Sequence, residues 1–179
     1  MVLYSRYFLQ SDTVFTINKA EQIDQSEINR DGYYLTVADM TYLARIITGD
    51  AYPFPKLEPF KHSVSVSFDN GTLSTESDAE IGSIWARFNV TDNFAVQNLT
   101  DMELQSNLQD SVLNVLIWAG TSYIINAIPS GVNDIFNISG GDPHLLYLEA
   151  SDYDGNLMTV LVRTSNGVVT FTPETDETQ

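Results

Sequence analysis

The sequence predicts a mainly β protein that begins with a small α-helical module. Apolar residues follow a helical period up to residue 50 and an alternating, strand-like period from residue 61 onward. Between these regions, residues 51–60 carry three prolines, which favour an extended linker. The alternating segments are short, numerous and separated by turn residues, a pattern typical of an antiparallel β-sandwich of the jelly-roll type. We therefore expect a two-helix module at 1–50, a linker at 51–60, a sandwich at 61–173 and an acidic tail at 174–179.

Two amphipathic helices are expected in the N-terminal module. Residues 1–10 place apolar side chains on one stripe, and a second stripe follows the sequence Thr36-x-x-Asp39. A threonine followed three residues later by an acid, just before an apolar run, is typical of a capping box, and Gly49 suits the C-cap. We expect the two stripes to pack against each other: Leu3, Tyr4, Tyr7 and Phe8 on the first helix, and Leu43, Ile46 and Ile47 on the second.

The segment before the second helix, residues 27–39, has the composition of a calcium loop. Calcium takes about six to eight oxygen ligands, and side chains at alternate positions of a short loop can supply many of them. The expected ligands of Ca²⁺ are Glu27, Asn29, Asp31, the backbone carbonyl of Tyr33, an oxygen of Thr36 or water, and Asp39. Gly32 permits the turn that points the Tyr33 carbonyl inward. Because Asp39 falls thirteenth and the loop starts with Glu, a helix cap without metal is the alternative.

An internal repeat relates the two helices. The stretch VLYSRYFLQ at residues 2–10 aligns with TYLARIITG at residues 41–49, which places Arg6 opposite Arg45. A duplicated unit of calcium loop and helix resembles a dockerin, a family that docks onto cohesin domains. In this alignment Met1 lies opposite Met40. The resemblance therefore implies that the chain begins inside the first helix and lacks the first calcium loop.

The region from residue 61 to 173 is predicted to contain short strands joined by tight turns. Asn70-Gly71 is a preferred two-residue hairpin turn, and Asp154-Gly155 is another. We expect the acidic string around Asp154 to form that turn rather than a metal site. The expected strands are 62–68, 72–75, 81–90, 94–97, 102–108, 112–119, 123–127, 135–139, 145–150, 157–163 and 168–172.

Residues 130–160 place a turn-rich segment before a strand and a final hairpin, in the sequence SGVNDIFNISGGDPHLLYLEASDYDGNLMTV. This order resembles the closing half of a cohesin-type sandwich. The resemblance implies a cohesin-like sandwich, so the chain would carry a dockerin-like module followed by a cohesin-like domain.

Charge and composition restrict the classes of function. The net charge is −16, of which residues 57–179 contribute −14 from seventeen acids and three bases. A field of that sign repels nucleic acid and anionic membranes and attracts divalent cations and basic surfaces. No apolar run is long enough to span a bilayer, and the absence of cysteine excludes disulfides and thiolate sites. No nucleophile, phosphate-binding or dinucleotide motif occurs, so we expect a protein that is not an enzyme.

These features together predict a non-catalytic assembly protein outside the cell or on its surface. Its partner would be a protein of cohesin or dockerin type, or a second copy that docks head to tail. Arg6 and Arg45 would then face the acidic sandwich of the next copy, and repetition of this contact gives a ring or a fibre. Folding back within one chain is one alternative. Another is a carbohydrate-binding or adhesive sandwich anchored by the calcium module, in which Trp85 and Trp118 are either sugar platforms or core residues.

Overall fold

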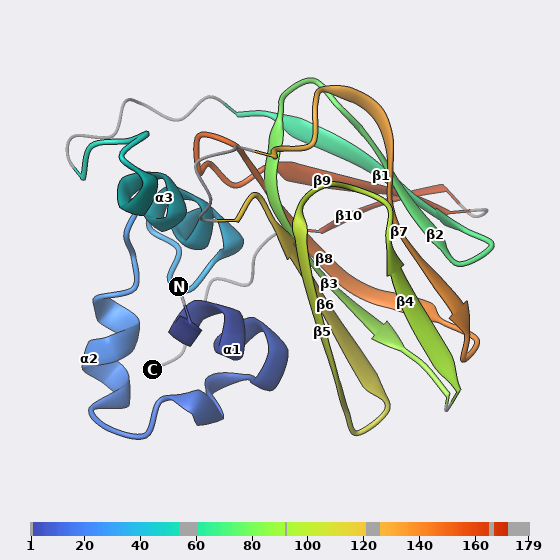
Figure 1. The fold of residues 1–179 in the computed structure, drawn as a ribbon, viewed down its shortest axis with the longest axis horizontal. Coiled ribbons are helices and arrows are strands. Elements are labelled where there is room, and N and C mark those ends of the chain that lie inside the picture. The colour runs from blue at the N-terminus through green and yellow to red at the C-terminus, as the bar shows by residue number, and fades with distance from the viewer. Residues whose placement is uncertain (1, 54–60, 92, 121–125, 165–166, 172–179) are drawn as a thin grey trace.

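A six-stranded sheet faces a four-stranded sheet, and N-terminal helices lie against the outer face of the smaller sheet (Figure 1). This is a computed structural model, and it describes residues 2–53, 61–91, 93–120, 126–164 and 167–171. The predicted acidic tail and most of the predicted linker and of predicted strand 123–127 lie outside the described residues. The predicted fold class is confirmed, because the chain is a mainly β sandwich with a few short helices.

The larger sheet has the strand order β10-β9-β1-β2-β7-β4. Its strands are β1 (Ser63–Asp69), β2 (Thr72–Ser77), β4 (Phe94–Asn98), β7 (Gly131–Gly140), β9 (Thr159–Thr164) and β10 (Gly167–Phe171). Asn70 and Gly71 both have positive φ in the turn between β1 and β2, as the predicted hairpin requires. Strands β1 and β9 pair in parallel, whereas the other pairs described in this sheet are antiparallel.

The smaller sheet has the strand order β5-β6-β3-β8. Its strands are β3 (Ile81–Asn89), β5 (Glu103–Gln109), β6 (Val112–Trp118) and β8 (His144–Asp152), all paired antiparallel. In β6 every residue after Val112 is buried. Since successive side chains point to opposite faces of a sheet, this strand is covered on both faces.

The N-terminal region forms helices α1 (Val2–Gln10), α2 (Lys19–Asp24) and α3 (Val37–Thr48), with a 3-10 turn, η1 (Asp12–Val14), after α1. The predicted capping box at the start of α3 is present. The side chain of Thr36 accepts from the backbone N–H of Asp39, and the Asp39 carboxylate accepts from the backbone N–H of Thr36. The helix ends at Thr48, and its C-cap is Gly49, whose φ of 80° lies in the left-handed region that favours glycine.

The chain has two apolar cores among its described residues. The first fills the space between the two sheets, and its fully buried side chains include Phe88, Phe136, Leu73, Ile84, Ile117 and Ile135. The second lies between the helices and the smaller sheet and contains Tyr4, Phe8, Leu9, Phe15, Leu35, Val37, Met40, Leu116 and Trp118. Because Leu116 and Trp118 belong to the sandwich, the two predicted modules share a buried surface.

Helix α3 buries a different face from the predicted one. Ile47 is 57% exposed, so its predicted place in the core of the helical module is wrong, whereas Leu43 is partly buried against the second core. The residues that α3 buries are Val37, Ala38, Asp39, Met40, Thr41, Tyr42 and Ala44. On α1, Tyr4 and Phe8 are buried as predicted, while Leu3 is 40% exposed.

Candidate docking interface on the four-stranded sheet

Helix α3 begins against strand β8. The backbone N–H of Val37, the first residue of the helix, donates a 2.7 Å hydrogen bond to Oε1 of Glu149. The hydroxyl of Tyr147 donates a 2.9 Å bond to the other oxygen of the same carboxylate. The first N–H groups of a helix lack partners within the helix and carry partial positive charge. A buried carboxylate of the sandwich therefore caps a helix of the N-terminal module.

One turn further along α3, three hydroxyl groups meet between the helix and the sheet. The Oγ1 atom of Thr41 lies 2.7 Å from Oγ of Ser83 in β3 and 2.7 Å from Oγ of Ser151 in β8. The two serine hydroxyls are 2.9 Å apart, and that of Ser83 also donates to the carbonyl of Val37 at 3.1 Å. All three side chains are buried. Each hydroxyl would lose partners if helix and sheet separated without water replacing them.

Two glycines allow α3 to lie close to the sheet. A Cβ atom at Gly82 in β3 would lie 2.5 Å from Cγ2 of Thr41, and a Cβ at Gly155 would lie 2.7 Å from Cβ of Tyr42. A larger side chain at either position would therefore push the helix away. Gly155 also accepts, through its carbonyl, a 3.1 Å hydrogen bond from the side-chain amide of Asn29.

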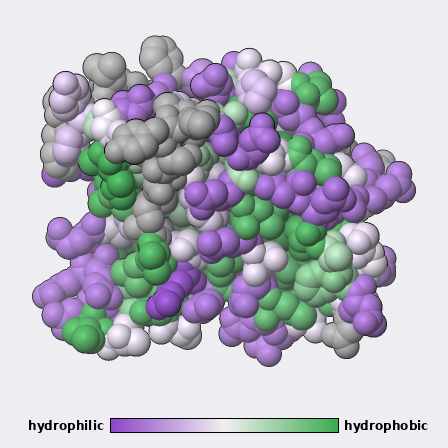
Figure 2. All heavy atoms as spheres, in the orientation of Figure 1, coloured by the Kyte–Doolittle hydropathy of each residue, from purple (hydrophilic) through white to green (hydrophobic). Residues whose placement is uncertain are grey.

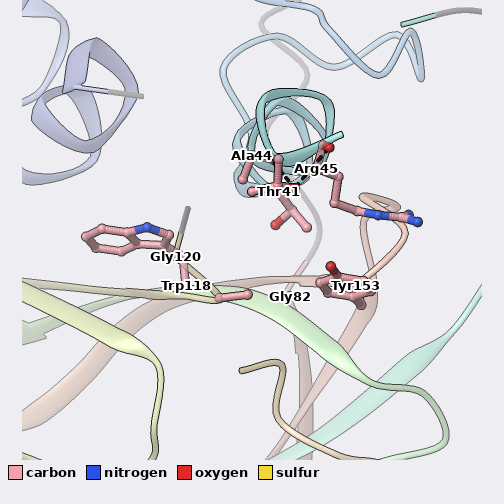
Figure 3. Close-up of a pocket in the computed structure, with 9 residues that line it drawn as sticks. Thr41, Ala44, Arg45, Gly82, Trp118, Gly120 and Tyr153 are labelled. Carbon is pink, nitrogen blue, oxygen red and sulfur yellow. Dashed lines mark hydrogen bonds between the residues drawn. The ribbon is translucent and has the colours of Figure 1, made fainter. Parts of the chain in front are cut away.

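The guanidinium group of Arg45 closes the C-terminal end of the interface. It lies 2.9 Å from a carboxylate oxygen of Asp50 and 2.5 Å from one of Asp154, in the turn after β8. It also lies 4.8 Å from the ring centre of Tyr153. Figure 3 shows Arg45 extending beside Tyr153 while Thr41 points from α3 toward the strands. The pocket between these residues has a volume of only about 10 Å³, so it is a packing gap with room for about one water molecule.

Helix α1 covers the neighbouring part of the same sheet face. Phe8 is 1% exposed, and its ring centre lies 5.2 Å from that of Trp85 in β3. The side-chain amide of Asn107 in β5 donates a 3.0 Å bond to the carbonyl of Leu9. Trp118 in β6 is 6% exposed and belongs to the second core. Both tryptophans of the chain therefore lie between the helices and the sheet rather than on an open face.

The predicted loop-closing residue, Asp39, is a fully engaged helix cap. Its Oδ1 atom accepts hydrogen bonds from the backbone N–H groups of Ile28 at 2.7 Å and Asn29 at 3.2 Å. Its Oδ2 atom accepts from the backbone N–H of Thr36 at 3.0 Å and from the Thr36 hydroxyl at 2.9 Å. The carboxylate thus ties the loop to the start of α3.

The other predicted calcium ligands are also hydrogen-bonded within the loop. Glu27 accepts from the backbone N–H of Gly32 at 2.6 Å. Asp31 accepts from the backbone N–H of Tyr33 at 2.9 Å and from the side-chain amide of Asn29 at 2.8 Å. Oxygen donors suit calcium in kind. In this arrangement, however, they face N–H groups, and the described residues hold no group of three or more His, Cys, Asp or Glu placed to bind a metal. The side-chain oxygens are engaged within the loop, so binding of calcium would require them to exchange these partners, and calcium binding stays a prediction from the sequence.

Burial raises the pKa of both carboxyl groups at the start of α3. Desolvation raises the pKa of Asp39 to about 6, although hydrogen bonds from Thr36 and Asn29 act in the opposite direction. Desolvation raises the pKa of Glu149 to about 7, and the negative charges of Asp39 and Asp31 add to this increase. At the junction of loop, helix and sandwich, burial therefore favours the neutral forms of these two carboxyl groups.

The two arginines predicted to bind a partner have different surroundings. Arg6 is exposed on α1. Arg45 meets an acid of the sandwich, as the charge argument required, but this acid is Asp154 of its own chain. The structure therefore shows the helical module folded back onto the sandwich, which was the alternative to head-to-tail contact.

Sequence reasoning missed the sandwich residues that receive α3, namely Ser83, Glu149 and Ser151. Polar residues at alternate positions of β3 and β8 are also what a solvent-exposed sheet face would carry. A different signal could have identified this face. Apart from Asn114, the run VLNVLIW of Val112–Trp118 is apolar at both alternations, which is typical of a strand covered on both sides.

No helix in the described parts of the chain combines the length and apolar character that crossing a membrane requires. Figure 2 shows hydrophobic residues in several separate groups on the face viewed, with hydrophilic residues between them. Together, fold and interface define a β-sandwich whose four-stranded sheet carries a docked helical module.

Comparison with known proteins gives one distant similarity. No family model and no curated protein matches the sequence. Among solved structures, the chain is similar to a non-cellulosomal cohesin from the hyperthermophilic archaeon Archaeoglobus fulgidus. The sequence identity is 15% and the TM-score is 0.39, over 57% of this chain and 86% of that chain. At these values the similarity assigns neither a family nor a function, and the resemblance of residues 1–50 to a dockerin stays a prediction.

Proposed function

We propose that this protein is a non-catalytic interaction module in which a helical segment docks onto the outer face of the four-stranded sheet. The observation that carries the proposal is the docking interface itself. The sheet supplies a cap for the helix and two hydroxyl groups, the turn after β8 supplies a carboxylate, and each meets a matching group of α3. Gly82 and Gly155 provide the close approach.

The composition of this interface supports docking between two partners. Interfaces between separate proteins combine an apolar centre with a polar, partly charged rim. Here Phe8, Met40 and Trp118 lie in the apolar part. The ion pair of Arg45 with Asp154 lies at the edge, where the Asp154 side chain is 69% exposed.

The partner we propose is a protein that carries the matching half, of cohesin or dockerin type, or another copy of this chain. Contact between the helical module of one copy and the sandwich of the next would link copies, and its repetition would build a ring or a fibre. Given the predicted resemblance, we place this assembly outside the cell or on its surface. Calcium is the ion we propose for the loop at residues 27–39.

Replacement of Thr41 by Arg tests the docking. Thr41 is 3% exposed, and a charged side chain at that position must leave the sheet to be solvated. We expect Thr41→Arg to release the module, so that tryptophan emission shifts to longer wavelength and acrylamide quenching increases. The far-UV circular dichroism of the sandwich should persist.

Ile47→Arg is the matched control, because Ile47 lies on the same helix but is 57% exposed. This variant should keep the emission and quenching of the wild-type protein. A Thr41→Arg protein that also kept them would show that this face does not hold the module.

A further inference from the structure

The sandwich contacts α3 at three positions spaced four residues apart. These contacts are made by the backbone N–H of Val37, the hydroxyl of Thr41 and the guanidinium of Arg45. Residues four apart lie on one face of a helix, one turn above each other. The sandwich therefore contacts three successive turns on one face of α3.

The groups that receive the helix also fix its direction. The carboxylate of Glu149 accepts from the N-terminal end of α3, where the helix dipole is positive. The carboxylate of Asp154 pairs with a cationic side chain near the C-terminal end. The hydroxyls of Ser83 and Ser151 lie between them. We call this set of four residues the seat.

A helix in the reverse direction would not fit the seat. It would place its C-terminal carbonyl groups, which are partly negative, against the buried Glu149 carboxylate. The repeat within this chain does not fit either, because Val2 of α1 occupies the position that corresponds to Thr41 and offers no hydroxyl.

We propose that the seat is a receptor for a helix, and that the α3 helix of a second copy of this chain occupies it. The helix that fits has an uncapped backbone amide at its first residue, a hydroxyl at its fifth and an arginine at its ninth. This inference rests on the proposed function and adds the pattern that the seat selects. The supporting observation is complementarity. Every seat residue belongs to the sandwich, every contacting group belongs to α3, and the same bonds form whether the two come from one chain or two.

The connection between helix and sandwich sets the balance between these two arrangements. Residues 49–62 join α3 to β1, so the seat and the helix of one chain are present at a high effective concentration. Docking within one chain is favoured in dilute solution, and exchange between chains is favoured when the internal contact is blocked or the protein is concentrated. A reciprocal exchange closes a two-fold dimer.

Trans-complementation of two full-length variants tests the proposal. The first variant, Thr41→Arg, has an intact seat and a helix that does not fit. The second, Ser151→Leu, has an intact helix and a seat filled by a larger side chain. Each variant alone should be monomeric, with solvent-exposed tryptophans. An equimolar mixture should give a dimer of twice the mass by light scattering, with tryptophan quenching reduced toward the wild-type value.

A second variant of the seat allows the same test if Ser151→Leu does not fold. Glu149→Lys places a positive charge against the helix N-terminus, and it should complement Thr41→Arg in the same way. Circular dichroism identifies which variants keep the sandwich. A mixture in which both variants are folded and undocked yet stay monomeric would overturn the second copy as the occupant.

The requirement for a hydroxyl at the fifth helix position is tested by changing Thr41 in the chain that supplies the helix. Ser151→Leu chains that also carry Thr41→Ser keep the hydroxyl and should still form the dimer with Thr41→Arg chains. Ser151→Leu chains that carry Thr41→Val should bind at least about tenfold more weakly, since buried serine hydroxyls are left without their partner. Equal dimer formation by the Thr41→Ser and Thr41→Val chains would show that the seat does not recognise the hydroxyl.

These outcomes separate the two proposals. If Thr41→Arg alone remains docked, the proposed function fails before any mixing. If Thr41→Arg is undocked and the mixtures do not complement, only the exchange between copies fails.

Discussion

Oε1 of Glu149 lies 2.7 Å from the backbone nitrogen of Val37, which precedes it by 112 positions in the sequence. A helix and the carboxylate that caps it thus belong to two parts of the chain that the sequence predicts as separate modules. The cap is buried, and its negative charge interacts with Asp39 in the first turn of α3 and with Asp31 of the loop before the helix. Docking and the protonation of Glu149 are therefore linked.

A rise in pH should destabilise the docked state through Glu149. Its pKa is raised in the folded protein from the ordinary 4.5 to about 7, so the folded state holds the proton more tightly than the unfolded chain. Stability should therefore fall as pH rises between these two values, by on the order of 3 kcal/mol in total, and change no further above them. Asp39, with a pKa raised to about 6, acts in the same direction.

Glu149→Gln isolates this contribution, because glutamine keeps an oxygen acceptor and does not ionise. Urea unfolding at pH 5 and pH 8 should show a smaller loss of stability for this variant than for the wild-type protein. Identical losses would mean that Glu149 does not titrate in this range.

Thr41→Val should cost about 1–3 kcal/mol, because it keeps the shape of the side chain and leaves two buried serine hydroxyls short of a partner. Thr48→Val is the matched control. Among the described residues, the Thr48 hydroxyl donates to carbonyls of its own helix turn, and this change should alter stability by about 0.5 kcal/mol or less. Chemical denaturation measures both, and equal effects would contradict the role of the hydroxyl group in docking.

From the sequence we predict that calcium binds the loop at residues 27–39 and raises the melting temperature of the protein. Asp31→Asn should remove most of this effect, because it takes one charge from the expected ligand set. Asp142→Asn, an equivalent change at a side chain that is 82% exposed, should leave it intact. Calorimetry that detects no heat of binding, together with a melting curve that chelator does not change, would rule out the site.

Gly155→Ala should weaken docking by more than backbone strain alone explains. Its φ is 74°, which costs an alanine about 1–2 kcal/mol, and the new Cβ would lie 2.7 Å from Cβ of Tyr42. Gly49→Ala is the matched control, with a φ of 80° and no atom within 4 Å of the added Cβ. The stability difference between the two variants measures the contact with α3. A larger loss in the control would contradict the close approach.

Local signals in the sequence predicted several elements well. The capping box of Thr36 and Asp39, the C-cap at Gly49 and the turn at Asn70-Gly71 depend on residues close in sequence, so their chemistry can be read directly. The alternating period likewise predicted the sandwich. The parallel pairing of β1 with β9 was not predicted, because register between distant strands depends on the whole sheet.

The buried face of α3 was missed for a physical reason. Hydrophobicity ranks Ile47 above Thr41, yet Ile47 is 57% exposed and Thr41 is 3% exposed. The helix approaches Gly82 so closely that small side chains and a hydroxyl with partners on the sheet fit best. Those partners lie in distant strands, and only the three-dimensional structure brings them to the helix.

The long separation between Val37 and Glu149 has a consequence during protein synthesis. At about 5–20 residues per second, strand β8 leaves the ribosome on the order of 10 s after helix α3. Strand β3 emerges within that interval and brings Ser83, but the newly made helix still lacks Glu149 and Ser151 of β8. Docking of α3 within one chain can therefore be completed only after most of the sandwich has been made.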